Sequence, residues 1–156
     1  MPVKRLKAFL DTHGVRYITI YHSRAFTAQE TAVSAHIPKR DLAKTVMVKI
    51  DGRMAMAVLP ASCKIDLDLL KKVVDSDSVE LANEREFKSL FPACEVGAMP
   101  PFGNLYGMEV FVSEDLAKNK EIAFNAGSHR ELVMMGYKDF ERLVQPKVSK
   151  FCIEIQ

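Results

Sequence analysis

The part of the chain best equipped for chemistry is the stretch GAMPPFGNLYGM, Gly97 to Met108, which contains three glycines and two adjacent prolines. Its glycines allow backbone conformations and close approaches that a β-carbon forbids, while the prolines stiffen the segment between them. The pattern predicts a rigid loop with backbone N–H groups held ready for developing negative charge. The candidate binding residues of this loop are Gly97, Met99, Pro100, Pro101, Phe102 and Gly103.

The apolar side chains of the same loop have two interpretations. Met99, Phe102 and Tyr106 are able to wall a small pocket or to stack on a base. The same spacing also suits a tight turn whose phenylalanine packs in the core. The sequence leaves both interpretations open.

A lysine within an apolar strand is the second candidate. Alternation along residues 44–50 places Lys44 on the face of Val46 and Val48, and Thr45 on the opposite face. Because lysine is seldom buried without a partner, its ammonium must reach out from the strand end or meet an anion in a cleft. Lys44 is therefore either a snorkelling side chain or a functional one.

A second turn of small and polar residues, Asn125 to His129, follows a predicted strand that ends at Phe124. Ser128 and His129 are neighbours in sequence, so they cannot be assumed to face each other as a nucleophile and its base. The chain also lacks GxSxG, Walker, HExxH and GxGxxG motifs. We expect Asn125, Gly127, Ser128 and His129 to line a pocket instead.

The metal and thiol residues show no recognisable pattern. The four histidines lack a metal-ligand spacing. The three cysteines, Cys63, Cys94 and Cys152, are odd in number, far apart and without a CxxC pair, which favours buried thiols and disfavours a redox protein. The sequence predicts neither a metal nor a cofactor.

Length and charge set the broad class. A chain of 156 residues fits one domain, and 48% hydrophobic with 27% charged residues is the balance of a globular protein. A net charge of +2 falls short of a duplex-binding protein, so no DNA partner is expected and any nucleic-acid contact should be local. The N-terminus does not resemble a signal peptide, and no apolar run is long enough to span a membrane, which predicts a cytoplasmic protein without a membrane partner.

Local signals predict an α+β fold. Gly14 should end a first helix, Thr27 and Glu30 match a capping box, and Asp51-Gly52 is the strongest hairpin signal in the chain. Helices interrupt the strands and some strand pairs are hairpins, so we expect a single domain over residues 1–156 with a mixed β-sheet flanked by helices. Further helices are expected after Asp66, after Asn83 and over residues 139–144, with strands over residues 15–21, 44–50, 53–59, 108–113, 121–124, 132–135 and 151–155.

Four stretches together resemble one family. "LAKTVMVK" from Leu42, "VLPAS" from Val58, "GAMPPFGNLYG" from Gly97 and "FNAGSHRELVMM" from Phe124 are similar in order and spacing to the YbaK/prolyl-tRNA synthetase editing domains. The resemblance runs from about Tyr21 to Val148 and implies the fold of that family. It also implies an aminoacyl-tRNA deacylase, which hydrolyses the ester between a wrong amino acid and the terminal adenosine of a tRNA.

The resemblance assigns roles to the candidates. The family lysine falls on Lys44, the family loop on Gly97 to Pro101, and the turn on Asn125 to His129. An activated ester needs a placed water and a stabilised oxyanion more than a protein nucleophile, so Lys44 and Gly97 become the catalytic candidates. Thr45 and the Ser128-His129 pair lie where relatives differ, and they are candidates for tuning the substrate.

The resemblance leaves the substrate and partners open. Alanine, serine, threonine and cysteine are the candidate amino acids, because a compact pocket excludes larger side chains. The expected partner is the acceptor end of an aminoacyl-tRNA, with an aminoacyl-tRNA synthetase as a candidate second partner. A module that binds tRNA or an amino acid without hydrolysis is the alternative.

Overall fold

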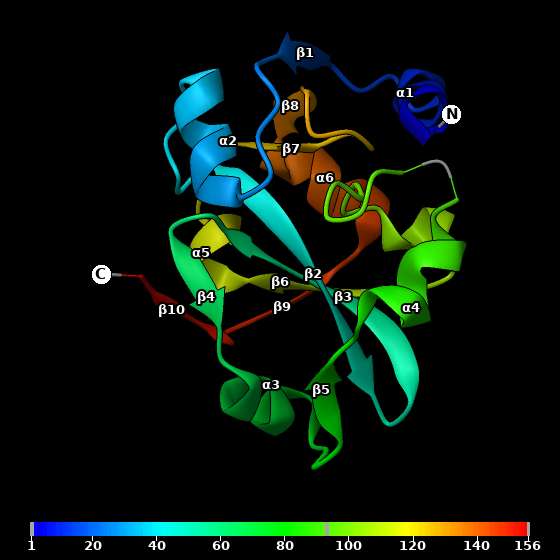
Figure 1. Ribbon diagram of the computed structural model, residues 1–156, viewed down its shortest axis with the longest axis vertical. Helices are drawn as coiled ribbons and strands as arrows, with labels where there is room; N and C mark the ends of the chain where they lie inside the picture. The colour runs from blue at the N-terminus through cyan, green and yellow to red at the C-terminus, as the bar shows by residue number, and fades with distance from the viewer. Residues whose placement is uncertain (1, 93, 156) are drawn as a thin grey trace.

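The computed structural model describes residues 2–92 and 94–155, which form one mixed sheet with helices packed around it (Figure 1). The helices are α1 (Pro2–Thr12), α2 (Ala28–Ala35), α3 (Leu67–Val74), α4 (Glu84–Phe87), α5 (Glu114–Ala117) and α6 (Tyr137–Val144), with 3-10 turns at Lys88–Leu90 and Gly103–Leu105. The strands are β1 (Tyr17–Tyr21), β2 (Leu42–Ile50), β3 (Arg53–Pro60), β4 (Cys63–Ile65), β5 (Val79–Leu81), β6 (Glu109–Ser113), β7 (Glu121–Asn125), β8 (Glu131–Gly136), β9 (Lys147–Ser149) and β10 (Cys152–Glu154).

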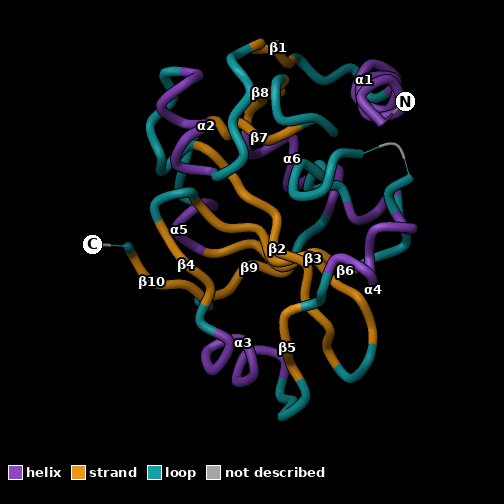
Figure 2. The backbone as a smooth tube through the Cα atoms, in the orientation of Figure 1, coloured by secondary structure: helices purple, strands orange, loops and turns teal. Residues whose placement is uncertain are grey.

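The main sheet has the strand order β1-β8-β7-β2-β3-β6-β9, and β5 adds to β2. β2 pairs with β7, β3 with β6 and β6 with β9 in parallel, whereas the remaining pairs of this sheet are antiparallel. β10 and β4 form a separate two-stranded sheet. The predicted α+β fold with a mixed sheet is confirmed, and Figure 2 shows β2, β3 and β6 crossing the middle, with α1, α2 and α3 toward the edges of the molecule.

The long hairpin of β2 and β3 crosses the centre of the molecule. Its turn forms at the predicted Asp51-Gly52, where both residues have positive φ values of 52° and 79°. Two positive φ values match the right-handed twist of the flanking strands, and glycine adopts one without steric cost. The hairpin registers Lys44 opposite Leu59 and Val48 opposite Ala55.

The helix ends also follow local signals. Thr27 caps α2 with the complete capping box to Glu30, and Asn83 caps α4 in the same way through Glu86. Asp66 caps α3 by accepting from the N–H groups of Asp68 and Leu69. These side chains satisfy backbone donors that have no partner within the helix.

Several short elements were not predicted from the sequence. β4, β5 and β9 are each three residues long and α5 is four. Segments this short carry no measurable periodicity, and their pairing partners are distant in the chain. β9, for example, pairs with β6, which lies more than thirty residues earlier. None of the described helices is long and apolar enough to cross a membrane.

The two faces of the hairpin bury different cores. Met47, Met56 and Val58 pack into the larger cluster with α1, α6 and the Gly97 loop. Val48, Ala55 and other residues of the opposite face pack with α3, Phe111 and Cys152. A third cluster joins Leu42 to α2, β7 and β8. The predicted alternation along β2 is therefore confirmed, with Val46 and Val48 on one face and Met47 on the other.

Phe102 belongs to the core. Its side chain is 0% exposed, and its ring lies 5.4 Å from that of Phe124 and 5.5 Å from that of Phe140, measured between ring centroids. Of the two interpretations left open for this phenylalanine, core packing is the observed one. The expectation that Phe102 binds substrate is corrected, because a fully enclosed ring has no face on which a base can stack.

Replacement of Phe102 by alanine should lower the free energy of unfolding by about 3–5 kcal/mol, because it removes a buried ring and leaves a cavity. Urea denaturation measures this difference. Ile18→Ala is the control, since Ile18 is 57% exposed and should change stability by less than about 0.5 kcal/mol. Equal losses in the two variants would contradict the core assignment.

Candidate active site at the fork between two strands

Two of the predicted site residues, Lys44 and Asn125, lie where β2 and β7 separate. The two strands pair in parallel only at Leu42 with Ala123 and at Ala43 with Phe124. Lys44 and Asn125 are the next residues of the two strands, so they lie at the same level just beyond the last pair. We call this position the fork.

The edge of β2 at the fork has no strand beside it. β7 covers the edge at Leu42 and Ala43, and β5 covers it again from Val48 to Ile50. In the part of the chain that the structure describes, no strand pairs with this edge between Lys44 and Val46, although the Met47 carbonyl accepts a bond from Ala82. An open edge of this kind presents backbone polar groups that a ligand can use.

Lys44 interrupts an apolar face. Leu42 before it and Val46 after it belong to two different hydrophobic clusters, and the side chain of Lys44 is half-buried between them. Burial lowers the pKa of Lys44 from its ordinary value, and the thiols of Cys63 and Cys152 act in the opposite direction. No carboxylate is among the described groups that shift this pKa. The ammonium is thus partly desolvated and available to an anion.

The Gly97 loop and the Gly127 turn are joined by backbone hydrogen bonds. The Glu95 N–H donates to the Gly127 carbonyl, and the Gly127 N–H donates to the Ala98 carbonyl, both over 2.8 Å. Gly97 is exposed and has a φ of +85°, a conformation that glycine adopts readily. Among the described residues, the Gly97 N–H has no acceptor. The rigid loop predicted from the sequence is therefore held against the predicted pocket turn.

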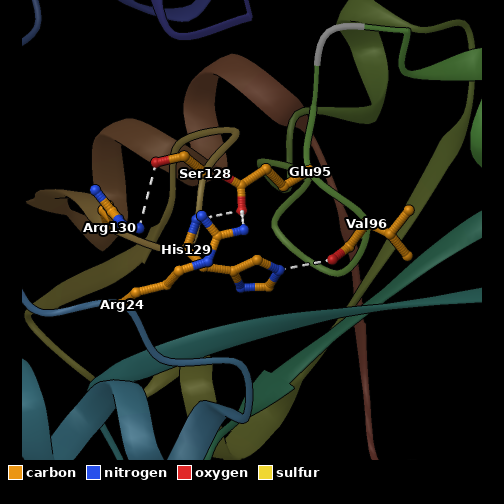
Figure 3. Close-up of polar contacts among 6 residues, drawn as sticks. All are labelled: Arg24, Glu95, Val96, Ser128, His129 and Arg130. Atoms are coloured by element: carbon orange, nitrogen blue, oxygen red, sulfur yellow. Dashed lines mark hydrogen bonds and ion pairs between the residues drawn. The ribbon is translucent and has the colours of Figure 1, made fainter.

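His129 lies beneath this loop with a defined ring orientation (Figure 3). Its Nε2 lies 2.7 Å from the Val96 carbonyl oxygen, which only accepts, so Nε2 carries the proton. The Nδ1 atom is buried and has no partner among the described residues, and the same holds for Oδ1 of Asn125. Buried polar atoms without partners are uncommon, and two of them here lie on predicted site residues.

Ser128 does not act on His129. The Ser128 hydroxyl accepts from the Arg130 N–H over 3.3 Å, and Figure 3 shows the Ser128 and His129 side chains pointing to opposite sides of the turn. The described part of the chain shows no hydrogen bond between the two side chains. This agrees with the expectation that two residues adjacent in sequence do not face each other as a nucleophile and its base.

Three residues at the site carried no signal in the sequence. The Arg24 guanidinium donates to Glu95 over 3.1 Å, and the same carboxylate accepts from the His129 N–H over 3.4 Å. The Phe26 ring is 64% exposed and lies 5.1 Å from the His129 ring, and the Arg24 guanidinium lies 5.2 Å from the centroid of the Phe26 ring. Arg24 and Glu95 are 71 residues apart, so only the tertiary structure brings them together.

The remaining candidates are more enclosed. Pro100, Pro101 and Gly103 are buried, and a β-carbon on Gly103 would lie only 2.7 Å from the Met108 carbonyl oxygen, which explains its glycine. Met99 is buried in the larger core cluster together with Ala43 and Met47. The buried side chains of this loop therefore anchor it in the core. Thr45 is half-buried on β2, on the face opposite Lys44.

The chain is a small α+β domain, and the described candidate residues at the fork include no hydrogen-bonded nucleophile–base pair. The family model for the aminoacyl-tRNA editing domain matches residues 22–143. The chain belongs to this family, and the resemblance seen in the sequence is confirmed. It is an aminoacyl-tRNA deacylase.

One relative and two solved structures are similar to this chain over nearly its whole length. The chain is 27% identical over 154 residues to the multifunctional Ser/Thr-tRNA deacylase ProXp-y of Escherichia coli K12, covering 95% of this chain and 91% of the relative. The hypothetical protein APE2540 superposes with a TM-score of 0.85 at 18% identity, covering 96% of this chain and 99% of that one. A protein described as a candidate trans-editing enzyme for prolyl tRNA synthetase superposes with a TM-score of 0.81 at 19% identity, covering 99% and 98%. The two structures establish the shared fold.

Replacement of Gly97 by alanine should reduce deacylation by about 10–100-fold, because a small displacement at a reacting centre is costly in rate. The new side chain would be strained at φ +85°, by about 1–2 kcal/mol, and would lie 3.5 Å from Cε1 of His129. Deacylation rates at saturating charged tRNA measure the effect.

Gly14→Ala is the matched control. Gly14 has a φ of +65°, and a β-carbon there would meet nothing within 4 Å. It should lose a similar amount of stability while retaining the wild-type rate. If the two variants lose activity equally, the effect comes from strain and not from the loop at the fork.

Proposed function

We propose that the fork is the active site and that it removes serine and threonine from mischarged tRNA. The observation that carries this proposal is the exposed backbone of Gly97, whose N–H has no described acceptor and which lies next to His129. Nδ1 of His129 and Oδ1 of Asn125 are buried acceptors without a described partner. A substrate that supplies hydrogen-bond donors would satisfy both atoms.

The chemistry requires little from protein side chains. Water attacks the carbonyl carbon of the aminoacyl ester, the bond from that carbon to the ribose oxygen breaks, and the ribose oxygen takes up a proton. The products are the free amino acid and the uncharged tRNA. We infer that the Gly97 N–H donates to the developing oxyanion and that a ribose hydroxyl of the substrate helps to activate the water.

Lys44 has an orienting role in this proposal. Its half-buried ammonium lies at the same level of the fork as Asn125 and has no described carboxylate acting on it. A phosphate or the ester end of the acceptor strand would supply the missing negative charge through charge-assisted bonds. Desolvation strengthens such a bond relative to one on the surface.

The proposed preference of the site for serine and threonine rests on its two hydrogen-bond acceptors, Oδ1 of Asn125 and Nδ1 of His129. The hydroxyl of serine or threonine is a donor, and so is the α-ammonium group of every amino acid. A site with two acceptors can bond both, whereas alanine leaves one buried acceptor unpaired, which is costly. The deacylase name of the Escherichia coli relative, which specifies serine and threonine, supports this choice.

We infer that the terminal base of the tRNA stacks on Phe26 and not on Phe102, whose ring is enclosed in the core. Its exposed ring lies next to His129 and beneath the Arg24 guanidinium. Such a ring suits the terminal adenine of the acceptor end, because a base stacks on an aromatic face without any sequence requirement.

The deacylase unit comprises the whole chain, since α1 and the C-terminal strands pack into the same clusters as the fork.

The first test is a panel of tRNAs charged with alanine, serine, threonine, cysteine and proline, with ester loss followed over time. We expect loss from the serine and threonine esters, and a decrease of about 10²–10³ in rate for Lys44→Ala, as for the loss of one well-aimed electrostatic group. Intact esters with binding retained would instead indicate a module that binds without hydrolysis.

Lys49→Ala is the matched control for this variant. Lys49 lies on the same strand but on the opposite face, where it pairs with Glu80 over 3.6 Å and with Glu86. Its removal should leave the deacylation rate unchanged. A Lys44→Ala protein with the wild-type fold by circular dichroism and undiminished activity would remove Lys44 from the mechanism.

Phe26→Ala should raise KM with little effect on kcat, because stacking on the terminal base binds the substrate and its transition state equally. Loss of one stacked base typically costs about 1–3 kcal/mol, which corresponds to roughly 5–150-fold in KM. Phe26→Tyr preserves the ring face and should behave as wild type. An unchanged KM in Phe26→Ala would show that the base binds elsewhere.

A further inference from the structure

Two cysteines and an aspartate converge on the face of β2 that also carries Lys44. Cys63 comes from β4, Cys152 from β10 and Asp115 from α5. One potential ligand atom of each, the two sulfurs and a carboxylate oxygen, lies within 4.8 Å of both others. β4 and β10 pair antiparallel, with Cys63 opposite Glu154 and Cys152 opposite Ile65.

Two residues of the cluster are buried and the third is exposed to solvent. Both cysteines are 3% exposed, whereas Asp115 is exposed, so the cluster joins two buried sulfurs to a carboxylate at the surface. The Cys152 thiol lies 3.6 Å from Oδ2 of Asp115. One of the three potential ligands is therefore on an exposed residue, where an ion in solution first meets the cluster.

We propose that Cys63, Cys152 and Asp115 bind a zinc-like divalent metal ion. Ligand bonds of about 2.3 Å to sulfur and 2.0 Å to oxygen place tetrahedral ligands about 3.8 Å apart for two sulfurs and about 3.5 Å for sulfur and oxygen. The distance between Cys152 and Asp115 already matches the second value, and the cluster needs less than about 1 Å of contraction to reach the first. Two thiolates and one carboxylate leave the fourth position to water.

The two sulfur ligands favour a zinc-like ion over an alkaline-earth metal. Binding releases the two thiol protons to solvent, because a coordinated thiol is deprotonated by the metal itself. Two thiolates, one carboxylate and a divalent ion then carry a net charge of −1. Lys44, whose ammonium responds to both cysteines, offsets this charge. Thiolates select zinc-like ions, whereas magnesium and calcium prefer oxygen ligands.

The bound ion would tie the last strand to the body of the domain. β10 pairs within the described chain only with β4, and α5 contributes the third ligand from beside the main sheet. At a free ion concentration of about 100 times Kd, binding to the folded state alone raises the Tm by about 5–10 °C for a domain of this size. This inference does not depend on the proposed function of the fork.

The test is a titration of the reduced, metal-free protein with Cd²⁺ as a spectroscopic substitute, followed by competition with Zn²⁺. We expect one equivalent to produce the ultraviolet absorption of a thiolate-to-cadmium charge transfer and to raise the Tm. Zn²⁺ should abolish the absorption, whereas Mg²⁺ should not.

Three variants locate the site. Loss of a residue that only contacts a metal ligand typically weakens metal binding by roughly 10–100-fold. Cys63→Ser or Cys152→Ser removes a ligand itself and should weaken Cd²⁺ binding by more than this. Asp115→Asn, a change at the surface, should weaken Cd²⁺ binding by about 10-fold. Cys94→Ser is the matched control, since Cys94 is a free cysteine outside the cluster, and it should bind as wild type.

Two results would overturn the proposal. One is the absence of charge-transfer absorption in reduced wild-type protein. The other is undiminished binding in Cys63→Ser or Asp115→Asn, which would place the ion elsewhere. If the serine variants fail to fold by circular dichroism, Asp115→Asn and Cys94→Ser decide between these outcomes.

Discussion

The candidate site depends on how β7 and β5 pair with different parts of the same edge of β2. β7 occupies two residues of the β2 edge and β5 occupies three further along, so the residues between them, beginning with Lys44, have a strand on only one side. A continuous neighbour would satisfy this backbone and cover the lysine. Because the pairing of β7 with β2 ends at Phe124 and Ala43, the two strands separate there, and the polar side chains of Lys44 and Asn125 follow in an otherwise apolar part of the sheet.

The Gly97 loop and the Gly127 turn are fixed to each other. Backbone bonds between Glu95 and Gly127 and between Gly127 and Ala98 join two segments that are about thirty residues apart. The buried Met99 and Phe102 anchor the loop from below, and His129 is oriented by the Val96 carbonyl from within it. The site therefore rests on rigid backbone, which suits a reaction that needs orientation more than a reactive side chain.

The face of β2 that carries Lys44 has two neighbourhoods. On one side of the lysine, Asn125 and the Gly97 loop form the fork. On the other, Cys63 and Cys152 lie close enough to oppose part of the lowering of the Lys44 pKa by burial. Lys44 therefore lies between the fork and the buried thiol pair.

The sequence by itself determined the local features. Capping at Thr27, the turn at Asp51-Gly52, the alternation along β2 and the need for glycine at position 97 depend on neighbours within a few residues. Only the tertiary structure decided that Phe26, not Phe102, faces the solvent at the site, and that Cys63, Asp115 and Cys152 meet. The reason is physical: local conformation is set by short-range sterics and hydrogen bonds, whereas contacts between distant segments follow from strand pairing, which leaves no periodic signal in the chain.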